Sequence, residues 1–262
     1  MKKVCSIGWM EWKKTVETPI FFGMILALAG LCMFIPVMNT DGQQSSCLQM
    51  FLTGDGMQAG MEILRQILSG YFIMFAPLLV GIALLPILCE SRESGMDRYV
   101  IHRSGIWELA AGRYLAAIAG GAVLVSLGFI VFSGIIGLHS LLLSREAAAL
   151  WKPAAIQVAQ SLLGTCLFGA VSAMWICLVS VFVRNRYLLV SIPYIAMWFV
   201  ERKTGAVQEA NIWVFMFGNG YLLHPLDIGK DVGIVLLFYA ALSVFVVVLM
   251  AETRKRGVDR GI

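Results

Sequence analysis

Residues that could carry out chemistry are few and scattered along this sequence. The histidines His102, His139 and His224 lie on separate segments, so no HExxH pair presents two imidazoles to a zinc ion on one helix face. His224 and Asp227 could bring an imidazole near a carboxylate, but a turn built around Pro225 explains that pattern and is favoured. Since the sequence also lacks a GxSxG nucleophile elbow, it predicts no catalytic centre and no metal site.

Motifs for phosphate binding and for paired cysteines are also missing from the sequence. Gly229-Lys230 is followed by Asp231 and lacks the upstream glycine of a GxxxxGK[ST] loop, so we expect no nucleotide cofactor in this chain. The six cysteines include no CxxC pair, and only Cys47 falls in a predicted outer loop. We therefore expect the cysteines to behave as small apolar residues and not as a disulfide framework.

The composition is that of a membrane protein. Hydrophobic residues make up 59% of the 262 residues and charged residues only 14%, against roughly 25% charged in a soluble domain. A helix that crosses about 30 Å of hydrocarbon needs about 20 mainly apolar residues. Six stretches without Asp, Glu, Lys or Arg meet or approach this length, and they are 20–38, 67–88, 114–139, 154–183, 187–200 and 232–251.

The distribution of basic residues predicts the orientation of these spans. The predicted outer loops hold only Arg65, Arg145, Lys152, Arg202, Lys203 and Lys230, which leaves 14 of the 20 lysines and arginines on the side of the two termini. By the positive-inside rule, both termini are expected in the cytoplasm, with the protein in the inner or plasma membrane. The short stretch 187–200 is retained as a span because the basic C-terminal tail would otherwise lie outside.

The predicted spans offer no residues for ion-coupled transport. They contain no Asp, Glu, Lys or Arg, and only His139 lies near the end of one. Ion-driven pumps and transporters usually carry such residues within the membrane. Any uphill transport is therefore expected to take its energy from a partner protein.

The first segment outside the spans with the organisation of a functional element is an N-terminal helix. Trp9, Trp12 and Val16 can share one face beside Lys13 and Lys14, as in a helix that lies in the membrane interface. A simple charged anchor in front of the first span explains the same residues equally well.

The second segment is the predicted cytoplasmic loop 90–113. Met96, Tyr99 and Val100 recur at helical spacing, and Ser104-Gly105 is expected to interrupt the chain before the next helix. Such a short amphipathic helix could dock in a groove of a soluble partner, although a solvated loop of mixed charge fits the same residues.

The third segment lies on the outer side, between 201 and 231. Its apolar run contains Trp213 and Phe215 and is broken by Gly218 and Gly220. The run is too short to cross the membrane, so we expect a re-entrant hairpin that dips into the outer leaflet.

Small residues in the third span predict close packing between helices. Ala116 with Gly120, and Ala117 with Gly121, are spaced four residues apart and so share helix faces. The expected consequence is a close approach of a neighbouring backbone at this level of the span.

Taken together, these features resemble the permease subunit of the type-2 ABC exporter family over most of the chain. Glu11-Trp12-Lys13-Lys14 followed by Thr18-Pro19 looks like the N-terminal amphipathic helix of that family. Residues 90–95 and 104–113 look like its coupling loop, and the short fifth span followed by an outer hairpin also matches. The chain departs from the family at Met96, where the family often has Thr, and at His102-Arg103, where it often has Pro.

The resemblance implies an all-α integral membrane protein in which 1–262 forms one permease domain of six transmembrane helices, with an N-terminal interfacial helix and an outer re-entrant hairpin. It also implies pairing with a second permease copy or paralogue, in the lipid bilayer, and binding of two ABC ATPase subunits that hold ATP and Mg. Nucleic acid is not an expected partner. The residues expected to transmit motion from the ATPase are Glu90, Arg92, Glu93, Gly95, Asp97 and Arg98.

The expected function is export or clearance of a hydrophobic or amphipathic substrate, such as a peptide antibiotic, a drug or a lipid. Two alternatives stay open on the sequence alone, namely a membrane-embedded enzyme and a sensor or structural subunit without transport activity.

Overall fold

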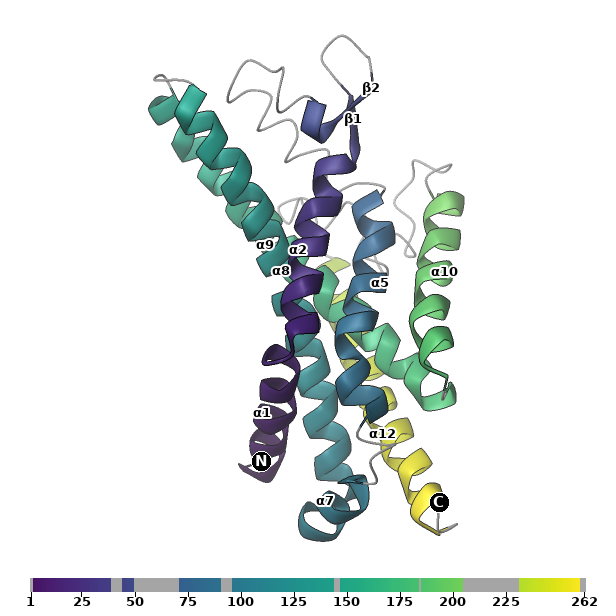
Figure 1. The fold of residues 1–262 in the computed structure, drawn as a ribbon. Helices are drawn as coiled ribbons and strands as arrows, with labels where there is room; N and C mark the ends of the chain where they lie inside the picture. Colours follow the sequence, from purple (N-terminus) through teal and green to yellow (C-terminus); the bar gives the residue numbers. More distant parts are fainter. Residues whose placement is uncertain are drawn as a thin grey trace.

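The chain folds into a bundle of long helices that run roughly along one common direction (Figure 1). The structure is a computed structural model, and it describes residues 2–38, 44–49, 71–90, 96–143, 147–183, 185–204 and 231–259. In chain order its elements are α1 (Lys2–Val16), α2 (Pro19–Phe34), β1 (Pro36–Met38), β2 (Gln44–Ser46), α5 (Tyr71–Leu85), the π-helix η1 (Pro86–Glu90), α7 (Met96–Ser104), α8 (Ile106–Leu143), α9 (Ala147–Phe182), α10 (Arg186–Thr204) and α12 (Asp231–Asp259).

Each of the six predicted apolar segments overlaps a helix. They correspond in order to α2, α5 with η1, α8, α9, α10 and α12. Within the described residues, two helical stretches are long and apolar enough to cross a membrane, namely Ile106–Leu138 and Ser161–Phe182. A third qualifies if α1 and α2 are counted as one bent span. The protein therefore has the helices of a membrane protein.

The junction between α1 and α2 is a sharp bend of 65°. Pro19 occupies the first turn of α2, where its missing N–H costs no hydrogen bond and its fixed φ suits a helix start. Thr18 precedes it in extended conformation, and its hydroxyl donates to the Thr15 carbonyl at 2.6 Å. This local chemistry ends α1 and redirects the chain.

The described residues are mostly helical, as predicted, but a short two-stranded ribbon follows α2. The span 20–38 was expected to remain helical to Met38, but α2 ends at Phe34 and β1 pairs antiparallel with β2, with Pro36 opposite Ser46. The cause is Pro36, because a residue that precedes proline is disfavoured in helical conformation. Ile35 accordingly takes ψ 130° and starts the extended strand.

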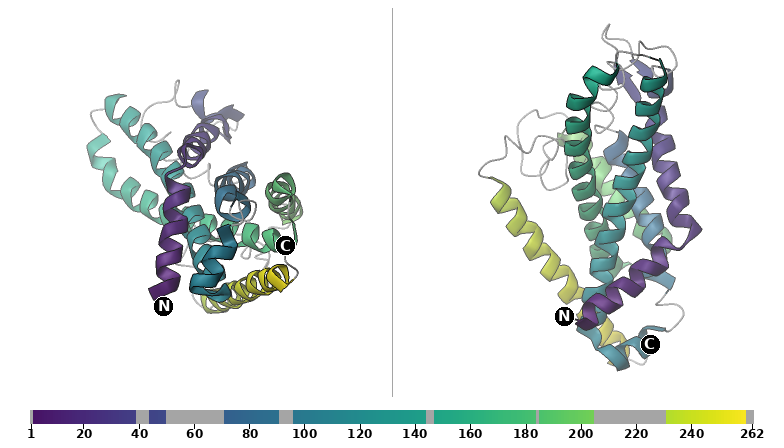
Figure 2. Two further views of the ribbon diagram at one scale, coloured as in Figure 1. Left: turned by 60° about the horizontal axis from the view of Figure 1, so that its bottom comes forward. Right: turned by 90° about the vertical axis from the view of Figure 1, so that its left-hand side faces the viewer.

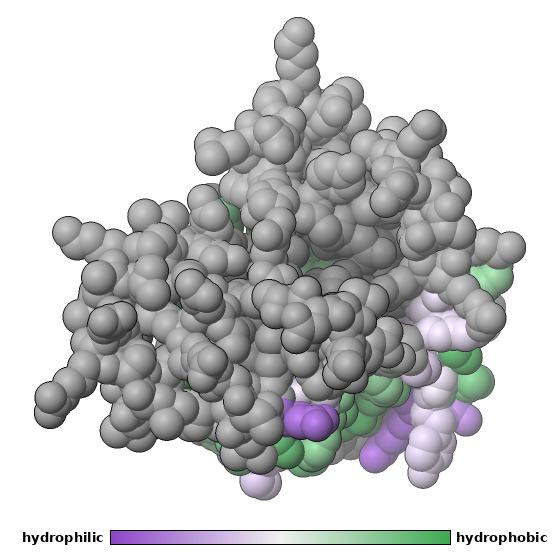
Figure 3. Space-filling model, turned by 90° about the horizontal axis from the view of Figure 1, so that it is seen from above, coloured by the Kyte–Doolittle hydropathy of each residue, from purple (hydrophilic) through white to green (hydrophobic). Residues whose placement is uncertain are grey.

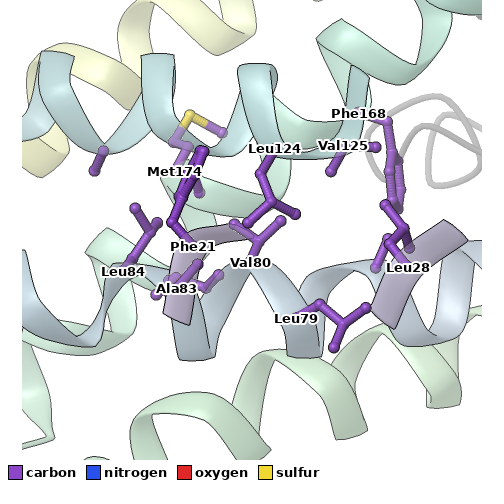
Figure 4. Close-up of a cluster of buried hydrophobic side chains, with 14 of the residues drawn as sticks. Phe21, Leu28, Leu79, Val80, Ala83, Leu84, Leu124, Val125, Phe168 and Met174 are labelled. Carbon is purple, nitrogen blue, oxygen red and sulfur yellow. The ribbon is translucent and has the colours of Figure 1, made fainter. Parts of the chain in front are cut away.

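The core is an apolar cluster contributed mainly by α2, α5, α8 and α9, with further residues from η1, α10 and α12 (Figure 4). Phe21 of α2 lies among Val80 of α5, Leu124 of α8 and Met174 of α9, and each of these side chains is buried. Because apolar lipid offers no hydrophobic driving force between helices, this part of the bundle depends on close packing.

Glycines bring α8 and α9 into backbone contact. A Cβ placed on Gly121 of α8 would lie 2.6 Å from the Gly169 carbonyl oxygen and 2.7 Å from the Cβ of Ala173, both on α9. The close approach predicted for the Ala117 and Gly121 face is therefore observed at Gly121. Only glycine on both helices leaves room for this crossing.

Both termini lie at the same end of the bundle as α7, and the β-ribbon lies at the opposite end (Figures 1 and 2). We call these the α7 end and the ribbon end. Viewed from the ribbon end, hydrophobic and hydrophilic side chains adjoin along the edge of the surface whose residues are described (Figure 3).

The α8 and α9 crossing makes a testable prediction. In Gly169→Ala the new methyl group would collide with the carbonyl oxygen of Gly121, a backbone atom that cannot turn away, so we expect a loss of about 1 to 3 kcal/mol of stability. The matched control is Gly134→Ala in α8, because a Cβ there meets nothing within 4 Å. The midpoint of thermal unfolding in mild detergent should fall for the first variant only. Equal midpoints would contradict the close crossing.

Candidate functional site

The candidate site lies at the α7 end, where α1, α7, the first turns of α8 and the last turns of α12 come together (Figures 1 and 2). The sequence analysis placed both the interfacial helix and the coupling loop in these segments. The structure adds the contacts that join them.

Helix α1 packs directly on the first turns of α8 through two glycines. A Cβ on Gly8 would lie 3.2 Å from the Gly112 carbonyl oxygen, and a Cβ on Gly112 would lie 3.1 Å from the Gly8 nitrogen and 2.9 Å from a methyl group of Ile7. The two backbones therefore touch. As in the packing of membrane helices, the absence of side chains lets the helices approach this closely.

A buried ion pair lies next to this glycine contact. The Nε of Arg113, on α8, donates to Oε1 of Glu11, on α1, at 3.0 Å. Both side chains are only 1% exposed, although the two residues stand 102 positions apart in the chain. A charge-assisted hydrogen bond in a region of low dielectric holds α1 in one register on α8.

Two further contacts of Glu11 come from residues of α1 itself. The Lys14 ammonium, half-exposed, lies 3.8 Å from Oε2 of Glu11. Thr15 is buried one turn later and turns its hydroxyl inward to the Glu11 carbonyl at 3.2 Å. Each oxygen of the Glu11 carboxylate therefore lies near a cation, Lys14 of the same helix or Arg113 of α8.

The residues predicted for the interfacial helix take different positions on α1. Trp12 packs against the core, whereas Trp9 is 65% exposed, with the two ring centroids 5.2 Å apart. Lys13 faces away from the core and pairs with Glu17 at 3.5 Å in an exposed contact. An exposed tryptophan beside lysines suits a headgroup region, and the membrane-interface role of this helix stays a prediction.

The link between α7 and α8 is a single glycine. Gly105 has φ +100°, a conformation that residues with a Cβ rarely adopt, and its added Cβ would collide with the Glu108 carboxylate. The Ser104 hydroxyl donates to the Val100 carbonyl at 2.6 Å and stabilises the last turn of α7. The predicted interruption at Ser104-Gly105 is therefore confirmed.

The predicted coupling residues fall partly within the described structure. Glu90 is the last residue of η1, and Asp97 and Arg98 belong to the first turn of α7. Arg92, Glu93 and Gly95 lie outside the described residues. Helix α5 continues into the π-helix η1, which has wider turns and ends at Glu90. Helix α1 packs against η1 as well as against α8, so it contacts the helices before and after the predicted loop.

A cavity of about 400 Å³ opens between the α7 and α8 junction and the end of α12. Its lining combines Ile106 and Trp107 of α8 with Glu252 and Lys255 of α12. Trp107 is 53% exposed. The α7 end therefore presents a hollow of mixed polarity beside the predicted docking helix.

A polar contact joins α12 to α8 farther along the bundle. The Tyr114 hydroxyl lies 2.7 Å from the Ser243 hydroxyl, which in turn donates to the Tyr239 carbonyl at 2.7 Å. Tyr114 directly follows Arg113, so consecutive residues of α8 bind the first and the last helix of the chain.

Trp213, Phe215, Gly218 and Gly220 lie outside the described residues, as does His224. Among the residues that the structure describes, no three His, Cys, Asp or Glu side chains come together as metal ligands.

The pair of Glu11 and Arg113 is not predicted from the sequence. Both residues were noted, Glu11 in the N-terminal motif and Arg113 at the end of the loop, but nothing in the linear order couples them. A usable signal would have been the arrangement of small and charged residues, with Gly8 three positions before Glu11 and Gly112 directly before Arg113. A buried charge pair beside a glycine contact requires a glycine and a nearby charged residue on each of the two helices.

The comparisons with known proteins do not extend this description. No protein-family model matches the chain, and no match was found among curated proteins.

The buried ion pair makes a prediction about stability. Arg113→Gln removes the cation and leaves the Glu11 carboxylate buried without it, so we expect a loss of about 3 to 5 kcal/mol. The exposed Lys13 and Glu17 pair provides the control, because Lys13→Gln should cost about 0 to 1 kcal/mol. Thermal unfolding in mild detergent measures both.

A double-mutant cycle sharpens this test. The variant Glu11→Gln with Arg113→Gln has no buried net charge at this contact and should unfold at a higher temperature than either single variant. If the two single effects simply add in the double variant, the two side chains do not interact as described.

Proposed function

We propose that this protein is the membrane-spanning permease subunit of an ATP-driven transporter of the type-2 ABC exporter kind. The observation that carries the proposal is the buried pair of Glu11 and Arg113, which fixes α1 to the first turns of α8, next to α7. The N-terminal helix, the loop and the third span thereby form one mechanical unit. A permease that is driven by a separate ATPase requires such a unit.

The proposed topology has six spans with both termini in the cytoplasm. Helices at all six predicted segments support the number of spans. The position of both termini and α7 at one end supports an even number of crossings (Figure 1). The excess of basic residues in the segments assigned to that end supports its cytoplasmic orientation.

In the proposed mechanism, an ABC ATPase subunit binds α7 and the preceding loop. Displacement of α7 is transmitted to α8 through Gly105. Helix α1 then moves together with α8, because the glycine contact and the ion pair hold the two helices together. The other end of α7 connects through the loop to η1 and α5. One docking event would therefore move α5 and α8 relative to each other.

The transport path is proposed to form between this subunit and a second copy or a paralogue. The described spans carry large exposed apolar side chains, among them Leu26 of α2 at 64% and Val244 of α12 at 66%, which face lipid or another subunit. A path of such residues suits a hydrophobic or amphipathic substrate, such as a peptide antibiotic, a drug or a lipid.

Copurification tests the proposal. A tagged full-length protein, extracted from its native membrane in mild detergent, should retain an ATPase subunit and hydrolyse ATP. The variant Glu90→Ala, Glu93→Ala, Asp97→Ala should lower bound ATPase or coupled hydrolysis by about tenfold or more, which corresponds to loss of a coupling free energy between the two subunits.

The matched control is Lys13→Ala with Glu17→Ala, which removes an exposed charge pair at the same end without touching the loop. This control should keep wild-type levels of ATPase. Purification of the wild type alone, without nucleotide hydrolysis, would reject the permease assignment.

A further inference from the structure

Two buried cysteines lie at the ribbon end of the protein. Cys32 lies in the last turn of α2, and Cys47 directly follows β2. Both side chains are 0% exposed, and both are free thiols in the structure. Both also belong to the same cluster of buried side chains.

The backbone around Cys47 is held in place by hydrogen bonds. The Cys47 N–H donates to the Ile35 carbonyl at 2.9 Å, which continues the ribbon by one step beyond the pairing of Pro36 with Ser46. The N–H of Gln49 donates to the Ser46 hydroxyl at 3.1 Å. Cys47 is therefore fixed beside the end of α2, and Cys32 precedes Ile35 by less than one helical turn.

We infer that Cys32 and Cys47 form a disulfide bond that ties the ribbon to the end of α2. This inference uses the orientation given under the proposed function, in which the ribbon faces the outer, oxidising side, where disulfides persist. The sequence analysis treated both cysteines as ordinary apolar residues because only Cys47 falls in an outer loop. The fold places its partner at the outer end of a span.

The oxidant is a low-molecular-weight disulfide outside the membrane. The deprotonated Cys47 sulfur attacks one sulfur of this disulfide, breaks its S–S bond and releases one thiol. The Cys32 sulfur then attacks Cys47 in the mixed disulfide, forms the Cys32–Cys47 bond and releases the second thiol. Two protein thiols are oxidised, one external disulfide is reduced to two thiols, and the protons pass from the cysteines to the products.

Burial raises the pKa of the Cys47 thiol to about 11. The thiolate that attacks a disulfide is therefore scarce at neutral pH while the ribbon is closed. Oxidation is expected while the ribbon is still forming, and the finished bond would be protected from exchange.

The bond would also border an apolar pocket of about 310 Å³ between α2 and α5. Cys32 lines this pocket together with Leu31 of α2, Ile35 directly after α2, and Phe72 and Phe75 of α5. Oxidation would hold one wall of the pocket in place. A hydrophobic substrate or lipid chain that enters from the outer side would meet this wall.

Counting free thiols tests the inference. Intact cells that produce the full-length protein are quenched in acid, denatured, and labelled with a polyethylene-glycol maleimide that adds a resolvable mass per thiol. Of the six cysteines, four should react before reduction and six after it. Labelling of all six before reduction overturns the inference.

Single substitutions identify the pair. Cys32→Ala and Cys47→Ala should each show five reactive thiols with and without reduction, because the remaining partner becomes free. The matched control Cys166→Ala should show three before reduction and five after it. If Cys47→Ala still shows a reducible pair, the disulfide joins other cysteines and the assignment is wrong.

The thiol count needs no folded variant and no ATPase, since labelling is done on denatured protein. Copurification of the ATPase is measured separately on the same cells. A missing disulfide with a bound ATPase overturns only the inference, whereas a disulfide without an ATPase overturns only the proposed function.

Discussion

A carboxylate and a guanidinium buried against each other set the geometry of one whole end of this molecule. Taking Glu11 and Arg113 out of water costs several kcal/mol for each charge, and only a close, well-aligned contact offsets that cost. Such a contact requires the two backbones to approach, which Gly8 and Gly112 allow. Once α1 is fixed on α8 in this way, the chain must turn sharply to enter α2, and the 65° bend before Pro19 provides that turn.

The two ends of the bundle are held by different kinds of interaction. At the α7 end, charged and polar contacts join helices that are distant in sequence, and a single glycine with φ +100° separates α7 from α8. At the ribbon end, α2 stops because of Pro36, and the short ribbon closes over buried Cys32 and Cys47. Between the two ends, α8 and α9 cross at Gly121 and Gly169. Close backbone packing therefore joins the helices in the middle of the bundle, whereas polar contacts join them at the α7 end.

The contact network also distinguishes the roles of neighbouring residues in the predicted coupling segments. Lys13 and Lys14 adjoin in sequence, but Lys13 makes only an exposed pair, whereas Lys14 approaches the buried Glu11 carboxylate. Arg113 and Tyr114 are likewise adjacent, and they bind α1 and α12 respectively. The helical turn explains this division, because consecutive residues of α8 point about 100° apart and so reach different neighbours.

The sequence by itself determined the helical membrane character, the positions of the apolar helices, the interruption at Gly105 and the need for small residues at Gly121. These features depend on local composition and spacing, which act within one or two helical turns. Only the tertiary structure decided that Glu11 binds Arg113 and that Cys32 lies near Cys47. Contacts of this kind depend on which helix faces pack together. Many apolar residues determine that packing jointly, and none of them alone identifies the neighbouring helix. The early end of α2 is an intermediate case, because Pro36 was visible in the sequence but the apolar run up to Met38 suggested a longer helix.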